Sequence, residues 1–189
     1  MRGPSDPAAP PRVLVAELVD LIGEAACAGL CAALLSGTDP ALHADELGYL
    51  GGRPGPHVLD GSWSPYWARV WGARGLLYVW APSAAAAVVA GLGDPHWRVA
   101  EMCLKVSGKR ELAEAGDPAT RLALHELTRV RATAVRTLGL VGDTEHLDTV
   151  VVSLDDEDSQ VRRTARLALE RLTLRLDITW SPEMGLPDA

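Results

Sequence analysis

One helix pattern returns at a fixed interval through the C-terminal half of this 189-residue chain. Val99, Val130 and Val161 are each 31 residues apart, and a small side chain or a thiol follows each valine by four residues. A fixed period of this length is typical of stacked helix pairs, each too small to bury its apolar face alone. The sequence therefore predicts an all-α fold, a short α-solenoid of stacked helix pairs.

Five segments are expected along the chain. Residues 1–11 contain four prolines and are expected to be a disordered tail, without the apolar run of a signal peptide. Residues 12–52 should form N-terminal helices, and the sequence leaves open whether these helices are a degenerate repeat. A Gly/Pro loop is expected over residues 53–64, the helical repeats over 65–178, and a C-terminal tail over 179–189.

The helix boundaries carry more specific expectations. Gly23 is expected to weaken the first helix without ending it, and the small residues of 25–35 should let helices approach closely. Because three carboxylates interrupt the apolar stretch 13–35, we expect a soluble helix pair there and no membrane span. Gly108 and Gly139 are predicted as helix ends, and a helix break is expected at residues 116–118.

The repeat also extends upstream of residue 94. Val70 precedes Val99 by slightly less than one full period, which indicates a two-residue deletion between these units. This register aligns Arg69 with Arg98 and Arg129, each of which comes directly before a valine.

Charge and cysteine content restrict the class of protein. The formal net charge of −7 argues against a protein that coats nucleic acid non-specifically, although 13 of the 18 Lys and Arg residues lie in residues 94–189. Cys27, Cys31 and Cys103 provide neither a disulfide framework nor a metal-binding spacing. A reducing cytoplasm is therefore the expected compartment.

The segment from Asp155 to Leu172 resembles the second helix of a HEAT repeat, and it is similar to the short HEAT-like units of phycobilin lyases. The units around Val130 and Val99 share the resemblance. It implies a right-handed superhelix in which the valine helices line the concave face. The fold by itself implies no activity.

HEAT units also often pair an aspartate of the turn with an arginine just after the valine. Asp156 with Arg162 fits that pattern. Asp94 has Ala100 in the arginine position, and Arg131 has His125 in the aspartate position. The resemblance therefore implies this ion pair for the last unit alone.

Basic side chains gather at the positions of the valine helices that are expected to be exposed. If positions 0, +4, +8 and +11 from each valine pack inward, positions −1, +2, +3 and +6 lie outside. Stacked repeats would align these side chains, and the guanidinium fork suits carboxylates or phosphates. The alternative is a set of solvated faces and inter-repeat ion pairs. The predicted partner-binding residues are Arg69, Arg98, Lys105, Arg129, Arg136 and Arg163, together with Trp67 and Trp71.

The two tryptophans belong to a cluster with helical spacing. Trp63, Trp67 and Trp71 are four residues apart, so a continuous helix would place them on one face. Such aromatic residues usually pack in a core. Partial exposure beside the Gly/Pro loop would instead make them an anchor for a partner.

The other polar constellations give no case for catalysis. His43 and Glu46 could face one metal with His57 and Asp60, but this spacing matches no known metal motif. The chain has no nucleophile elbow and no Gly-rich phosphate loop. We therefore predict no enzyme activity, no metal and no cofactor.

These observations lead to one functional hypothesis with two alternatives. The hypothesis is a non-catalytic protein-interaction module or scaffold that binds an acidic segment of a protein partner along the concave face, with no membrane association. A nucleic-acid-binding helical repeat with a basic groove, as in certain DNA glycosylases, is the first alternative. An accessory lyase-like protein, suggested by the phycobilin lyase resemblance, is the second.

Overall fold

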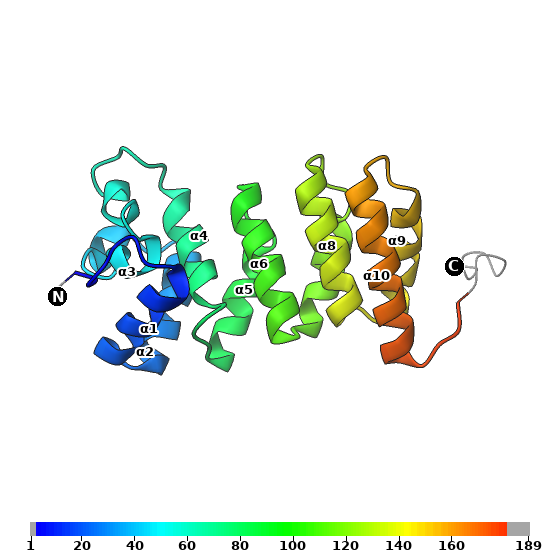
Figure 1. The fold of residues 1–189 in the computed structure, drawn as a ribbon, viewed down its shortest axis with the longest axis horizontal. Coiled ribbons are helices and arrows are strands. Elements are labelled where there is room, and N and C mark those ends of the chain that lie inside the picture. The colour runs from blue at the N-terminus through cyan, green and yellow to red at the C-terminus, as the bar shows by residue number, and fades with distance from the viewer. Residues whose placement is uncertain (1–2, 181–189) are drawn as a thin grey trace. The chain divides into compact units, whose positions relative to one another are not determined.

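The computed structural model describes residues 3–180, and these residues form α-helices and short 3-10 helices without any strand. The all-α helical-repeat fold predicted from the sequence is confirmed. The α-helices are α1 (Pro11–Ile22), α2 (Glu24–Leu35), α3 (Leu47–Gly51), α4 (Tyr66–Gly75), α5 (Ala85–Gly91), α6 (Trp97–Arg110), α7 (Gly116–Leu122), α8 (Thr128–Val141), α9 (Leu147–Val152) and α10 (Ser159–Leu176), as labelled in Figure 1. The chain divides into two compact units after Val106, within α6, and each unit is described by itself.

The repeat period is more regular in the structure than the valines suggest. The second helices of the pairs begin one constant period apart, at Tyr66, Trp97, Thr128 and Ser159. The first helices begin at the same interval, at Ala85, Gly116 and Leu147, and a 3-10 turn precedes each of them. The two-residue deletion predicted upstream of Val99 is therefore wrong. Ala68, which is buried, takes the place of the valine in α4, so Arg69 aligns with Ala100 and not with Arg98.

The N-terminal unit contains a sharp corner at Gly23. This residue ends α1 with φ of 86°, a value that side-chain-bearing residues rarely adopt, so the expectation of an uninterrupted helix is wrong. The close approach expected for α2 is confirmed, because a Cβ built on Gly72 of α4 would lie 2.5 Å from the carbonyl oxygen of Cys31. All three cysteines are free and buried.

Ser5 and Pro7 hold the segment expected to be a disordered tail against the rest of the N-terminal unit. The backbone N–H of Ser5 donates to Glu17 Oε1 of α1 at 2.9 Å. The carbonyl oxygen of Pro7 accepts from the backbone N–H of Arg53 at 3.1 Å, so this segment also ties down the start of the Gly/Pro loop. A 3-10 helix, Gly55–Val58, occupies part of that loop. Of the expected C-terminal tail, residues 181–189 lie outside the described residues.

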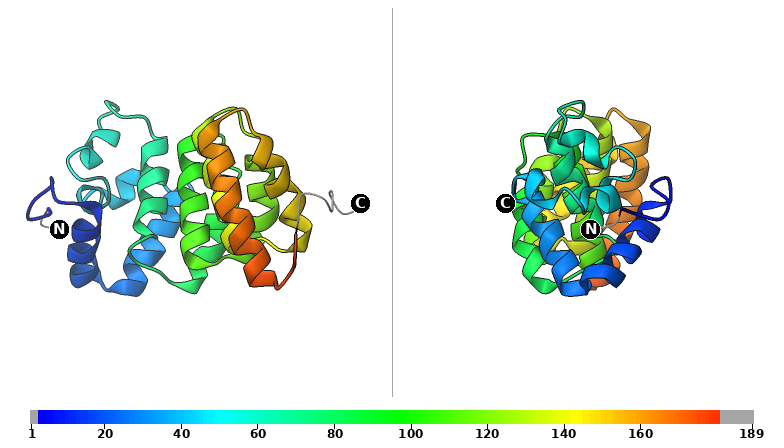
Figure 2. Two further views of the ribbon diagram at one scale, coloured as in Figure 1. Left: turned by 45° about the vertical axis from the view of Figure 1, so that its right-hand side comes forward. Right: turned by 90° about the vertical axis from the view of Figure 1, so that its left-hand side faces the viewer.

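The C-terminal unit is built around the contact between α8 and α10. Figure 1 and Figure 2 both show these helices side by side. Gly139 makes the contact possible, because a Cβ there would lie 2.6 Å from the Cα of Ala168. Gly108 and Gly139 thus lie inside helices, and the prediction that they end helices is wrong. The expected break at residues 116–118 is also absent, since α7 begins at Gly116 and Pro118 falls in its first turn, where no intrahelical donor is needed.

No single helix within the described residues combines the length and hydropathy of a membrane span. Helices α1 and α2 meet those criteria only when taken together, and they are bent by 119° at Gly23.

Candidate functional site

Arg69 is committed to an ion pair within the N-terminal unit. Its Nε donates to Asp94 Oδ2 at 2.7 Å, and its Nη2 donates to Asp94 Oδ1 at 3.2 Å. Asp94 Oδ1 also accepts the backbone N–H of His96 at 2.8 Å, in the turn before α6. This pair links α4 to the turn that starts the next second helix. Arg69 therefore has a structural role and offers little to a ligand.

Arg131 makes the equivalent pair in the C-terminal unit. Its Nε and Nη2 donate to the two carboxylate oxygens of Asp156 at 2.9 and 3.0 Å, and Nη2 also donates to Glu157 Oε1 at 3.1 Å. The side chain of Arg131 is 9% exposed. Hydrogen bonding from Arg131 holds the pKa of Asp156 below its usual value, and the carboxylate raises the pKa of Arg131 in turn. The pairing predicted from the HEAT resemblance is therefore wrong in its partner, because Arg162 donates to the carbonyl oxygens of Asp156 and Glu157.

Five side chains at the start of α4 and α6 form what we call the aromatic–arginine patch: Tyr66, Trp67, His96, Trp97 and Arg98. The rings of Tyr66 and His96 are stacked, with centroids 3.4 Å apart and planes 14° apart. The guanidinium carbon of Arg98 lies 4.2 Å from the ring centroid of Trp97 and 5.5 Å from that of Trp67. Each of the five residues is half-buried. The patch is thus an ordered aromatic surface with a cation over two of its rings.

The charge of Arg98 is not neutralised by an acidic neighbour. Among residues 3–180, no carboxylate forms an ion pair with its guanidinium, which is held by the indole faces. Stacking uses the faces of the guanidinium and leaves N–H groups at its edge for hydrogen bonds. Burial, followed by the nearby Arg98 charge, lowers the pKa of His96, so this ring stays neutral in the stack near pH 7.

The two tryptophans predicted to bind a partner have different environments. Trp71 is buried, at 2% exposure, with its ring against Gly51, so it belongs to the core and is not a contact residue. Trp67 is half-buried and lies 5.1 Å from the ring of Trp63. The core interpretation therefore applies to Trp71, and the anchor interpretation stays open for Trp67.

The sequence-based prediction found Trp67 and Arg98 separately but missed that they are neighbours. Trp97 and Arg98 follow Tyr66 and Trp67 by one full repeat, so the corrected repeat register places these pairs at equivalent points of successive helices. The valine register had moved them two positions apart.

The other predicted basic residues have different local environments. Lys105 pairs with the buried Glu101 at 2.8 Å. Arg129 and Arg136 are exposed on α8. Arg136 and Arg171 of α10 both line a pocket of about 300 Å³. Arg163 is exposed and lies two residues after Val161, in the position that the buried Ala132 has in α8.

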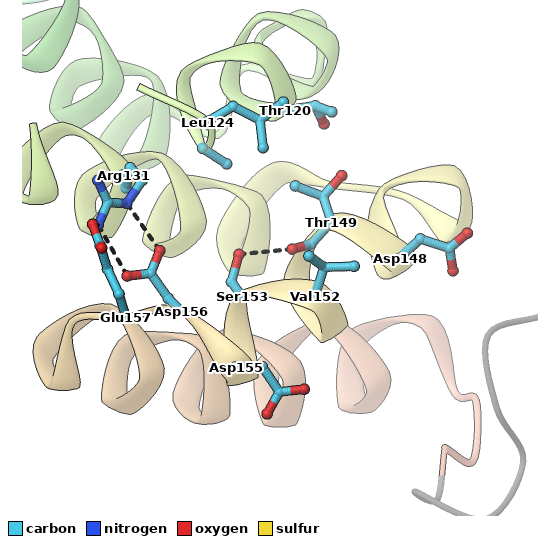
Figure 3. Close-up of a pocket in the computed structure, with 11 residues that line it drawn as sticks. Thr120, Leu124, Arg131, Asp148, Thr149, Val152, Ser153, Asp155, Asp156 and Glu157 are labelled. Atoms are coloured by element: carbon cyan, nitrogen blue, oxygen red, sulfur yellow. Dashed lines mark hydrogen bonds and ion pairs between the residues drawn. The ribbon is translucent and has the colours of Figure 1, made fainter. Parts of the chain in front are cut away.

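A larger groove lies between α7 and α9, with a volume of about 600 Å³. Figure 3 shows Leu124, which follows α7, on the opposite side of this α7–α9 groove from Val152 of α9. Arg131 and its carboxylate partners lie at one end, and Asp148 lies at the other. The lining residues are Thr120, Ala123, Leu124, Arg131, Asp148, Thr149, Val152, Ser153, Asp155, Asp156 and Glu157. Sequence reasoning missed the groove because it considered only the second helices.

The candidate metal ligands of the loop are used in a turn. Asp60 accepts hydrogen bonds from the backbone N–H and the hydroxyl of Ser62, and its other oxygen lies 3.2 Å from His57 Nδ1. The hydroxyl of Ser62 therefore contacts the carboxylate and not the imidazole, which is not the arrangement that activates a nucleophile. No group of three or more His, Cys, Asp or Glu side chains in residues 3–180 is placed to hold a metal ion.

The hydrogen bonds in this turn predict a lowered pKa for the Asp60 carboxyl, which can be measured. Hydrogen bonds from Ser62 are the main reason that the pKa of Asp60 falls to about 2. We expect Ser62→Ala to raise this pKa toward its ordinary value of 3.8. Carbon-detected NMR titration of the Asp60 carboxyl measures the change. His57→Gln serves as the control and should raise the pKa less, because His57 contributes less to the shift. An unchanged pKa in Ser62→Ala would exclude this hydrogen-bonding arrangement.

Comparison with known families covers the C-terminal part of the chain. Residues 118–179, about a third of the chain, match the family model of HEAT repeats, and the match does not extend to the phycobilin lyase type. HEAT repeats generally act as protein-interaction scaffolds and are generally non-catalytic. No protein with a curated function is significantly similar to the chain.

Proposed function

We propose that the protein is a non-catalytic interaction module whose aromatic–arginine patch binds an acidic segment of a protein partner. The single observation that carries this proposal is the position of Arg98 between Trp97 and Trp67, without a carboxylate partner in the described residues. Trp, Tyr and Arg are the residues that most often dominate the binding energy of protein interfaces. The patch combines all three in one ordered cluster.

The chemistry of the patch favours a carboxylate as its ligand. A guanidinium held over an indole ring loses little side-chain entropy when it binds, so its hydrogen bonds contribute more to affinity. The surrounding rings supply apolar area for a side chain next to the acidic residue. A short segment with Asp or Glu beside an apolar residue would fit both features. The free, buried cysteines support our proposal that the protein acts in the reducing cytoplasm.

Selection from random peptides tests the proposal without knowledge of the partner. Phage-displayed 12-residue peptides are selected on immobilised wild-type protein, on Arg98→Gln, and on the matched control Arg12→Gln, which removes an exposed arginine from α1. Wild type and Arg12→Gln should enrich peptides rich in Asp and Glu. Arg98→Gln should lose that enrichment, and fluorescence anisotropy should show about tenfold or weaker binding of the selected peptides, since hydrogen bonds to charged groups are strong.

Two results would contradict the proposal. One is a set of selected peptides without acidic enrichment, and the other is unchanged binding by Arg98→Gln. Retention of duplex DNA that depends on Arg98 and weakens steeply with salt would instead assign the patch to nucleic acid.

A further inference from the structure

The α7–α9 groove presents apolar side chains that no described element covers. Leu124 is 79% exposed and Val152 is 58% exposed, and Figure 3 shows them on opposite sides of the groove. Singly exposed apolar residues are ordinary on protein surfaces, but two that line the same concavity indicate a docking site. A pocket of about 600 Å³ can take several side chains of an inserted segment.

The charge of the groove restricts what could bind there. Four carboxylates line it, those of Asp148, Asp155, Asp156 and Glu157. Arg131 is the only basic residue that lines the groove, and its guanidinium already donates hydrogen bonds to Asp156, Glu157 and two backbone carbonyls. An anionic ligand would therefore be repelled, whereas a cationic segment with apolar side chains would be attracted.

Polar atoms without hydrogen-bond partners at one end of the groove also favour a cationic ligand. Asp148 Oδ1 and Thr120 Oγ1 have no hydrogen-bond partner among residues 3–180, and both residues line the groove. A rotation of the Asp148 carboxylate would let it accept from an ammonium or guanidinium group, and buried polar atoms nearly always find such partners.

We propose that the α7–α9 groove binds a basic amphipathic segment of a partner protein, with apolar side chains between Leu124 and Val152 and Lys or Arg side chains on the carboxylates. Helix-in-groove binding of this type uses apolar anchors on one helix face and charges at the rim. This surface differs from the aromatic–arginine patch in position and in the sign of its charge. The protein would then bind two partner segments of opposite charge.

A synthetic peptide tests the groove directly. The probe is a fluorescein-labelled 18-residue helix of Leu, Lys and Ala in amphipathic order, and the comparison peptide replaces every Lys with Glu. Wild-type protein should bind the Lys peptide, with affinity that falls as salt rises, and should not bind the Glu peptide. Leu124→Ser should weaken binding of the Lys peptide about tenfold, because one buried leucine is lost from the complex.

Matched variants separate the groove from general attraction to an acidic protein. Leu42→Ser removes a leucine that is 74% exposed in the N-terminal unit, and it should leave binding unchanged. Glu157→Gln removes a carboxylate of the rim, and Glu114→Gln removes an exposed one outside the groove. Of these two charge variants, only Glu157→Gln should weaken binding of the Lys peptide. The effect should be modest, because the rim is solvated. Circular dichroism spectra confirm that each variant is folded.

Three results would overturn the proposal. In the first, Leu124→Ser and Leu42→Ser bind the Lys peptide equally well. In the second, the Glu peptide binds as tightly as the Lys peptide. In the third, light scattering shows concentration-dependent self-association of the wild type that Leu124→Ser abolishes, which would identify a second copy of this chain as the occupant.

Discussion

Replacement of Arg131 by alanine is expected to destabilise the C-terminal unit by about 3 kcal/mol, because it leaves the carboxylate of Asp156 without its buried partner. Both side chains are largely shielded from water, at 9% and 13% exposure, so solvent cannot replace the guanidinium well. Arg131 also donates to the carbonyl oxygens of His125 and Glu126, and these hydrogen bonds would be lost as well. Urea denaturation followed by circular dichroism measures the change, and hydrogen exchange locates it in the unit.

Arg162→Ala is the matched control for this prediction. Arg162 reaches the same turn but donates to backbone carbonyls of Asp156 and Glu157, so its loss should cost only about 1 kcal/mol. The double variant Arg131→Ala with Asp156→Ala should be less destabilised than the sum of the two single variants, because the uncompensated charge is absent. A strictly additive double variant would show that the ion pair contributes nothing beyond its separate contacts.

The effect of Arg131→Ala on the free energy of unfolding should depend on pH. Arg131 lowers the pKa of Asp156 in the folded protein, so the pair stabilises the fold fully above the unfolded pKa of about 4. That contribution is lost as the pH falls through the lower, folded pKa. The difference in stability between wild type and Arg131→Ala should therefore be constant near neutral pH and shrink below about pH 4. A difference that grows on acidification would contradict the pairing.

The architecture could be predicted because the repeat is encoded in periodic apolar residues. Val99, Val130 and Val161 lie at equivalent buried positions, and their constant spacing gave the all-α fold directly. The repeat register was predicted wrongly for α4. There Ala68 occupies the position of the valine, and Val70, two residues later, is also buried. A single apolar position cannot distinguish these choices. The helix starts distinguish them, but they depend on turns that the pattern of valines does not describe.

Partner choice within the turns could not be derived from sequence spacing alone. Arg69 and Arg131 each bind the aspartate 25 residues later, in the turn of the next unit. His125, in the aspartate position of another turn, accepts the backbone N–H of Leu127 through Nδ1, as Asp94 does for His96. The sequence shows which positions are polar, and side-chain reach between neighbouring helices determines which of them pair.

Glycine positions were the other source of error, and Gly139 shows the reason. A glycine near the end of a helical pattern indicates a helix end when only local conformation is considered. In the structure Gly139 lies inside α8, where the backbone of α10 comes too close for any side chain. Close packing between helices far apart in sequence gives no local signal, except that Gly108 occupies the equivalent position one repeat earlier, also within a helix.

Gly139→Ala is therefore expected to destabilise the C-terminal unit by about 2 kcal/mol, although alanine is the better helix former. The gain in helix propensity is about 1 kcal/mol. The new Cβ would lie 2.6 Å from the Cα and 2.8 Å from the Cβ of Ala168, so α10 must move away from α8, and such overpacking commonly costs up to about 3 kcal/mol or more. Hydrogen exchange should show faster opening of α8 and α10, and urea denaturation should show the lower stability.

Gly29→Ala is the control that separates propensity from packing. Gly29 is exposed within α2, and a Cβ there would meet no atom within 4 Å. This substitution should stabilise the protein by about 0.5–1 kcal/mol, because only the conformational cost of glycine is removed. The two substitutions are chemically identical and should have effects of opposite sign. If Gly139→Ala proved as stabilising as Gly29→Ala, the close contact between α8 and Ala168 would not exist in solution.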